Sequence, residues 1–210
     1  MDAKILKEAW LVLNRRYTND ITLSEQLWQE LETAYTAKGR YYHTLQHINE
    51  MLLLVATHST SLQDTDSLSF AIFYHDIIYS PLSKDNEEKS AALAVKRLQR
   101  LGLPAQQQAH IRQMILATKA HVSSSDPDTN LLLDFDLSIL ASAWDHYLTY
   151  TRQIRKEYSI VPYLLYKKGR KKVLQHFLAM PRIYKTQQFY EQYEEVAKQN
   201  MEWELQQLLA

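Results

Sequence analysis

The sequence predicts an all-α protein, folded as one helical domain over residues 1–210. Three glycines and five prolines in the whole chain are too few for a fold rich in tight turns. Apolar residues recur at spacings of three and four residues almost from end to end, and the alternation typical of strands is rare. Hydrophobic residues make up 46% of the chain, an ordinary proportion for a globular protein with a substantial core. We therefore expect helices joined by short connections.

The first half of the chain contains three amphipathic helices followed by a buried one. The second helix is expected to begin after Thr22 or Ser24 and to end at Gly39, because glycine often follows a helix C-terminus. The stretch Leu68–Tyr79 is apolar nearly all round, which predicts a central buried helix. The other helices expected in this region cover residues 3–17, 42–57 and 68–79.

Two further helices and a loop are expected between Asp85 and residue 130. Asp85 and Glu88 have the spacing of a capping box, for a helix that ends at Gly102. Pro104 suits the first turn of the next helix, which is expected to run to about His121. Residues 122–130 form a loop by composition, and 131–141 are a short apolar run. The last three helices are expected at 144–158, 162–179 and 186–209.

The charge balance and the lack of cysteine exclude several classes of function. The chain has 24 Lys and Arg against 24 Asp and Glu, so no long-range field attracts nucleic acid or an anionic membrane. With no cysteine, disulfides, thiolate nucleophiles and sulfur-based zinc sites are excluded. The opening residues do not resemble a signal peptide, and no apolar stretch approaches the roughly 20 residues of a membrane helix. We expect a soluble cytoplasmic protein.

The pair His75-Asp76 is the most informative feature of the sequence. It lies in the most apolar stretch, AIFYHDIIYS, where an unpaired carboxylate would cost several kcal/mol. Successive helical residues point about 100° apart, so a mutual hydrogen bond explains the pair poorly, whereas a metal ion could contact both. The structural alternative is an ion pair between Asp76 and an arginine, with a core histidine bonded to a carbonyl.

Two other features favour a metal site. His43 and His47 are four residues apart, which places them on one face of a helix. Asp134 and Asp136 lie in an apolar run, and because they are two residues apart only one is expected to be buried. Together with the His-Asp pair they supply imidazoles and carboxylates in the order histidine, histidine-aspartate, aspartate.

The sequence resembles the HD superfamily of metal-dependent phosphohydrolases, which are all-helical proteins named for their His-Asp pair. The resemblance is closest to a small bacterial branch of predicted HD phosphohydrolases and covers most of the chain. The segments that carry it are RYYHTLQHI, AIFYHDIIY, DNEEKSA, LLDFDLSIL, IRKEY and the GR…VL…FL stretch from Gly169. Such proteins include nucleotidases, cyclic-nucleotide and alarmone hydrolases and oxygenases, so the fold alone does not define the reaction.

The resemblance implies a metal shell of two histidines and two aspartates: His47, His75, Asp76 and Asp136. In that family the first histidine heads a helix that continues with apolar residues, and the last aspartate is followed by a leucine-bearing helix. The resemblance therefore favours His47 over His43 and Asp136 over Asp134. A nitrogen and oxygen shell without sulfur suits Mn²⁺, Fe²⁺, Co²⁺, Ni²⁺ or Zn²⁺, and Mg²⁺ less well. In such a site a divalent ion would activate a water molecule and polarise a phosphoryl group.

Several residues are candidates for the remaining roles. A general acid or base is expected among His43, Glu87, Glu88 and His121, although both glutamates are also explained by the helix dipole. Phosphate contacts are expected from Arg40, Lys84 and Arg155.

The remaining histidines and one basic cluster have simpler interpretations. His110 is expected at the surface, and His58, His146 and His176 to be structural or solvated. The cluster Lys167, Lys168, Arg170, Lys171 and Lys172 is interpreted as the solvated face of one helix.

Three functions follow from these residues. The favoured one is hydrolysis of a small phosphorylated metabolite by metal-activated water, with a nucleotide as the favoured class in view of the resemblance. The alternatives are a metal-holding nucleotide-binding regulator without turnover and a di-iron oxygenase. Neither a long nucleic acid nor a membrane is expected as a partner. A homodimer through tyrosines of the last helix is a further option, but core packing explains these tyrosines equally well.

Overall fold

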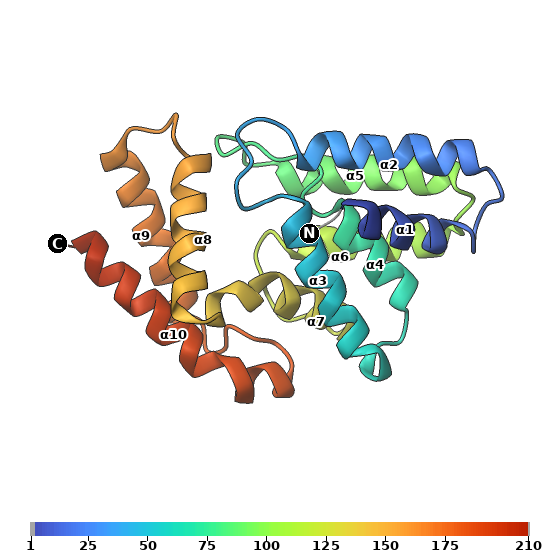
Figure 1. The fold of residues 1–210 in the computed structure, drawn as a ribbon. Coiled ribbons are helices and arrows are strands. Elements are labelled where there is room, and N and C mark those ends of the chain that lie inside the picture. Colours follow the sequence, from blue (N-terminus) through green and yellow to red (C-terminus); the bar gives the residue numbers. More distant parts are fainter. Residues whose placement is uncertain (1–2, 210) are drawn as a thin grey trace. The chain divides into compact units, whose positions relative to one another are not determined.

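A computed structural model describes residues 3–209 of the chain. Within that range it contains ten α-helices, two short 3₁₀ helices and no strand, which confirms the all-α fold class (Figure 1). Contacts between Cα atoms divide the chain into two compact units, the first ending at Leu132 and the second beginning at Leu133. This boundary falls inside helix α7 (Pro127–Asp136), so one continuous helix belongs to both units.

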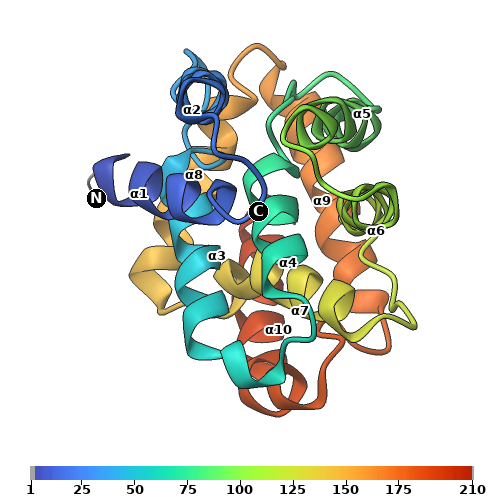
Figure 2. The same ribbon diagram turned by 90° about the vertical axis from the view of Figure 1, so that its right-hand side faces the viewer.

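The first unit is built around helix α4. Figure 2 shows α4 among α3, α5 and α6, and all three helices contact it. Its apolar residues from Leu68 to Tyr74 are at most 1% exposed, as expected for a central buried helix. Trp10 packs edge-on against Phe70, Phe73 and Tyr74. The helices of this unit are α1 (Ala3–Asn14), α2 (Ile21–Tyr35), α3 (Leu45–Thr57), α4 (Thr65–Tyr74), α5 (Asn86–Arg100), α6 (Ala105–Ala117) and the first part of α7, with a 3₁₀ turn at Ser59–Ser61.

Helix α4 ends five residues earlier than the sequence predicts. It stops at Tyr74, and a turn follows in which the amide of Ile77 donates to the carbonyl of Tyr74 over 3.2 Å. The Arg40 guanidinium donates to the carbonyls of Asp76 and Ile77 at 2.7 and 2.8 Å. These carbonyls are beyond the last helical turn and need such a partner. The apolar pattern reflected burial of the turn as well as of the helix, so the prediction of a helix to Tyr79 was wrong.

Other helix boundaries also differ from the expectation. Helix α2 begins at Ile21 because Asp20 caps it, accepting from the Leu23 amide at 2.8 Å. It ends at Tyr35, before Gly39, which lies in the following turn with φ +98°. The capping box predicted at Asp85 is absent, since that carboxylate accepts from Ser83 and pairs with Lys89 instead.

Gly102 ends helix α5 as predicted. Its φ is +84°, and the amide of Leu103 donates to the carbonyl of Leu98 while that of Gly102 donates to Gln99. These two bonds form a Schellman motif, whose left-handed residue favours glycine.

The second unit contains the end of α7 and three long helices. The predicted loop at 122–130 is shorter than expected, because α7 already begins at Pro127. Asp126 caps this helix, accepting from the Thr129 amide at 3.0 Å. The later helices agree with the predicted ranges to within a residue or so. They are α8 (Trp144–Glu157), α9 (Tyr163–Ala179) and α10 (Gln187–Leu209), preceded by a 3₁₀ segment at Leu137–Ala141.

A buried ion pair joins the three long helices. Arg170 of α9 donates to both carboxylate oxygens of Glu204 in α10, at 2.7 and 2.9 Å. The hydroxyl of Tyr147 in α8 donates to the same carboxylate over 2.6 Å, and burial raises the pKa of Tyr147. Arg170 also donates to the hydroxyl of Tyr150. The prediction that the basic cluster of residues 167–172 is a solvated helix face was therefore wrong for Arg170. The helical period places this side chain on the buried side of α9.

Removing Arg170 should destabilise the second unit strongly. The variant Arg170→Met leaves the Glu204 carboxylate buried without its cation, so we expect a loss of about 3–5 kcal/mol in unfolding free energy. Urea denaturation followed by circular dichroism measures this loss. The control Lys89→Met breaks an exposed pair with Asp85 and should cost less than about 1 kcal/mol. Equal losses in the two variants would contradict the assigned role of the buried pair.

Candidate metal centre

His75 occupies the position that ends helix α4 and is 1% exposed. Its Nδ1 lies 2.8 Å from the carbonyl oxygen of Ile72, so Nδ1 carries a proton and donates it to that carbonyl. In the neutral ring, Nε2 then carries a lone pair. A carbonyl bond of this kind was part of the structural alternative for His75, but it also orients a histidine that ligates a metal.

The Nε2 atom of His75 faces the carboxylate of the next residue. It lies 3.2 Å from Oδ2 of Asp76, whose side chain is 15% exposed. Two lone-pair acceptors at this distance repel unless a proton or a cation lies between them. The two side chains converge because they follow the last helical turn. The objection that successive helical residues diverge therefore does not apply to this pair.

His43 and His47 approach the same pair from the start of α3. His47 lies in the first turn, is 3% exposed, and its ring centroid is 5.3 Å from that of His75. His43 precedes the helix, so the prediction that the two histidines share one helical face was wrong. Its Nε2 is 3.8 Å from Asp76 Oδ2, and its ring packs against that of Tyr79 at an angle of 30°, with centroids 4.1 Å apart.

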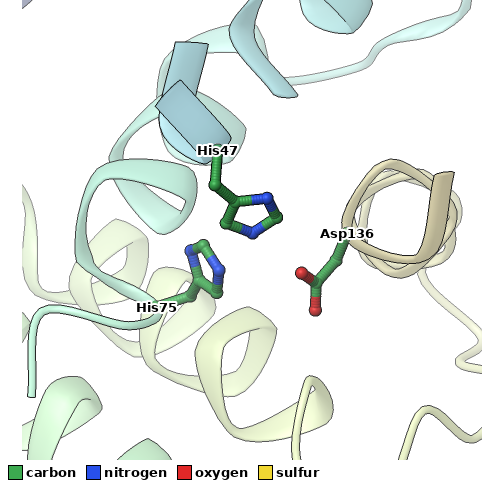
Figure 3. Close-up of side chains that lie close together, drawn as sticks. All are labelled: His47, His75 and Asp136. Carbon is green, nitrogen blue, oxygen red and sulfur yellow. The ribbon is translucent and has the colours of Figure 1, made fainter. Parts of the chain in front are cut away.

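Asp136 is the last residue of α7 and completes a group that could hold a metal ion. One ligand atom each from His47, His75 and Asp136 lie within 4.8 Å of one another (Figure 3). Both histidines are buried and the aspartate is half-buried. Two imidazoles and a carboxylate suit a first-row transition metal ion, which matches the expected donor types.

Asp134 has a different function in the structure. Its carboxylate is fully buried and accepts from the amides of Lys185 and Thr186 at 2.6 and 2.8 Å. The Thr186 hydroxyl donates to it as well, and burial raises the pKa of this carboxyl. Asp134 thus holds the segment that precedes α10. Of the two aspartates left open by the sequence, Asp136 is the one placed with the histidines.

Arg40 supports the turn that contains Asp76. Besides the carbonyls of Asp76 and Ile77, it donates to the carbonyl of His43 over 3.1 Å. The guanidinium also lies over the rings of Tyr35 and Tyr79, 4.9 and 5.5 Å from their centroids. Tyr79 was not singled out from the sequence, because its place in an apolar stretch is typical of a core residue.

The other predicted site residues lie outside the group of three, and their roles remain predictions. Glu87 is half-buried in the first turn of α5, and His121 has an unusual φ of 49°. Lys84 is exposed, and its carbonyl accepts from Lys119, which also pairs with Glu88 and lowers the pKa of that carboxyl. Arg155, in the second unit, donates to the carbonyls of Tyr158 and Val161.

His110 has a structural partner that the sequence did not reveal. It was expected at the surface, but it is half-buried with Nε2 2.9 Å from the carboxylate of Asp126. Asp126 is also the residue that caps α7. The pair therefore links α6 to the start of α7.

No protein-family model, curated protein or solved structure matches this chain. No described helix is long and apolar enough to cross a bilayer. The resemblance to HD phosphohydrolases therefore stays a prediction from the sequence motifs, and the geometry shows only that His47, His75 and Asp136 could hold a metal ion.

Loss of Arg40 should disturb both stability and metal affinity. In Arg40→Met three carbonyls lose a charged donor, so we expect a decrease of about 1.5–3 kcal/mol in unfolding free energy. Because the turn positions His75 and Asp76, affinity for Co²⁺ should fall on the order of 10- to 100-fold in calorimetric titration. The exposed Arg112→Met is the matched control and should change neither value. Unchanged Co²⁺ affinity in a folded Arg40→Met protein would contradict the positioning role.

Proposed function

We propose that this chain is a metal-dependent phosphohydrolase that acts on a small phosphorylated metabolite, with a nucleotide as the favoured class. The observation that carries the proposal is the approach of His75 Nε2 to the Asp76 carboxylate at 3.2 Å, beside His47. This arrangement calls for a positive charge between the two groups. The group formed by His47, His75 and Asp136 supports a divalent ion as that charge.

The residues fit a divalent cation by number, type and charge. His47 and His75 offer imidazole nitrogen donors and Asp136 a carboxylate oxygen, and Asp76, which lies outside this group of three, is the proposed second oxygen donor. Two carboxylates balance the charge of a divalent ion, so a buried shell of this composition is close to neutral. When bound, such an ion supplies electron withdrawal from a phosphoryl group and a water of lowered pKa.

The protein side chains have separate roles in this proposal. His75 is held by the Ile72 carbonyl, which fixes the ring orientation, and Asp76 is held through its backbone by Arg40. His43 is the group best placed to move a proton, because its side chain is 18% exposed and can exchange protons with solvent. The ring of Tyr79, which packs against that of His43, limits its rotation.

The metal content and turnover of the purified protein test the proposal. We expect bound transition metal in the isolated protein, measured by inorganic mass spectrometry, and phosphate release with Mn²⁺, Co²⁺ or Ni²⁺ in a nucleotide panel. In His75→Ala and Asp76→Ala, metal occupancy and phosphate release should fall on the order of 100-fold with the helical content unchanged. His176→Gln, on the exposed side of α9, should behave like the unaltered protein.

Other results would favour the alternatives. Tight nucleotide binding without turnover in the metal-loaded protein would support a regulatory metal protein. Two irons per chain would support an oxygenase. A protein that retains no metal, and whose phosphate release does not respond to added metal, would contradict the proposal.

His43→Gln separates proton transfer from metal binding. Glutamine keeps a polar side chain near Asp76 but cannot act as a general base near neutral pH. We expect kcat to fall on the order of 10²- to 10⁴-fold, with metal content retained and KM little changed. Steady-state kinetics with the most active substrate of the panel, together with metal analysis of the same sample, provide the measurement. A kcat within a few fold of the unaltered enzyme would rule out His43 as the proton-transfer group.

A further inference from the structure

The beginning of helix α9 exposes several large apolar side chains next to one another. Ile160 is 74% exposed and Leu164 is 77% exposed, and Tyr163 and Leu165 are also largely in solvent. We refer to Ile160, Tyr163, Leu164 and Leu165 as the α9 tip. An isolated exposed leucine needs no explanation, but four large apolar residues within six positions mark an interaction surface.

Unpaired lysines follow the α9 tip along the same helix. Residues 158–190 contain seven Lys or Arg and no Asp or Glu. Lys167, Lys168, Lys171 and Lys172 form no ion pair with any carboxylate within residues 3–209. Helical spacing places Leu164, Lys168 and Lys171 on one face of α9. That face therefore carries apolar residues at its start and positive charge further along.

The α9 tip is held in place by the residues behind it. Arg155 donates to the carbonyls of Tyr158 and Val161 at 2.6 and 3.3 Å, and its guanidinium lies 4.8 Å from the centre of the Tyr166 ring. The amide of Val161 donates to the Tyr158 carbonyl at 2.9 Å. A preformed connection of this kind costs little ordering entropy when it binds a partner.

We propose that the α9 tip and its four lysines dock the protein on the surface of an anionic lipid bilayer. With a rise of 1.5 Å per residue, Lys168 and Lys172 lie roughly 6 and 12 Å along the helix from Leu164. This separation suits apolar side chains placed about 5–10 Å into the interface with lysines at the headgroups. The lysines complement anionic headgroups, and no acidic residue in 158–190 opposes them.

This proposal departs from the expectation that the chain has no membrane partner. That expectation was based on the zero net charge of the whole chain. Attraction to a charged surface depends instead on charges within a Debye length of it, about 10 Å at 0.1 M salt. A solvated helix face explains the lysines, but it does not explain the exposed Ile160, Leu164 and Leu165 beside them.

Vesicle sedimentation tests the proposal with the full chain. We expect binding to vesicles of phosphatidylcholine mixed with phosphatidylserine, weakened by salt, and little binding to phosphatidylcholine alone. At a factor of roughly five per lysine, Lys168→Gln/Lys172→Gln should bind on the order of 30-fold more weakly. The matched control Lys38→Gln/Lys96→Gln alters two exposed lysines of the first unit and should bind within about 2-fold of the unaltered chain.

The apolar residues need a separate measurement. Leu164→Trp should show a blue-shifted fluorescence increment with the anionic vesicles, relative to the unaltered chain, and Leu164→Gln should bind more weakly. Absence of binding to anionic vesicles would overturn the proposal. So would equal losses in the two double-lysine variants, or a concentration-dependent dimer that Leu164→Gln dissociates, which would assign the α9 tip to a second copy of the chain.

Discussion

The binding of Arg40 to the carbonyls beyond helix α4 is the interaction on which the candidate site depends. The turn that follows α4 needs partners for its buried carbonyls, and one guanidinium supplies them for Asp76 and Ile77. The helix can therefore end at Tyr74. His75 and Asp76 then lie in a turn, where their side chains converge at 3.2 Å instead of diverging around a helix.

Charge in the first unit is also balanced locally, between groups a few ångströms apart. The core around α4 is almost wholly apolar, and at its edge the buried His75 lies beside the carboxylate of Asp76, with the ring of His47 5.3 Å from that of His75. The bond from His75 to the Ile72 carbonyl leaves its second nitrogen directed at this carboxylate. In a region of low dielectric, a proton or a cation between the two groups would relieve their repulsion. The zero net charge of the chain has no influence on this repulsion, because the repulsion acts between groups a few ångströms apart.

Helix α9 illustrates how the helical period separates neighbouring charges of one sign. Arg170 is buried and forms a bidentate pair with Glu204, whereas Lys168 and Lys172 point to solvent. The arginine therefore links helices of the second unit, and the lysines leave one face positively charged. Two different physical roles thus arise from a single run of basic residues, KKGRKK.

The sequence by itself determined the all-α class, the buried character of α4 and the ranges of α8 to α10, because these depend on the local spacing of apolar residues. It also identified the residue types of the candidate site. Only the tertiary structure decided that α4 stops at Tyr74 and what Asp134 does, and it groups Asp136, which the resemblance favoured, with the histidines. The physical reason is that helix ends and side-chain directions depend on partners distant in sequence. Arg40 binds the turn after α4, and Thr186 binds the carboxylate of Asp134.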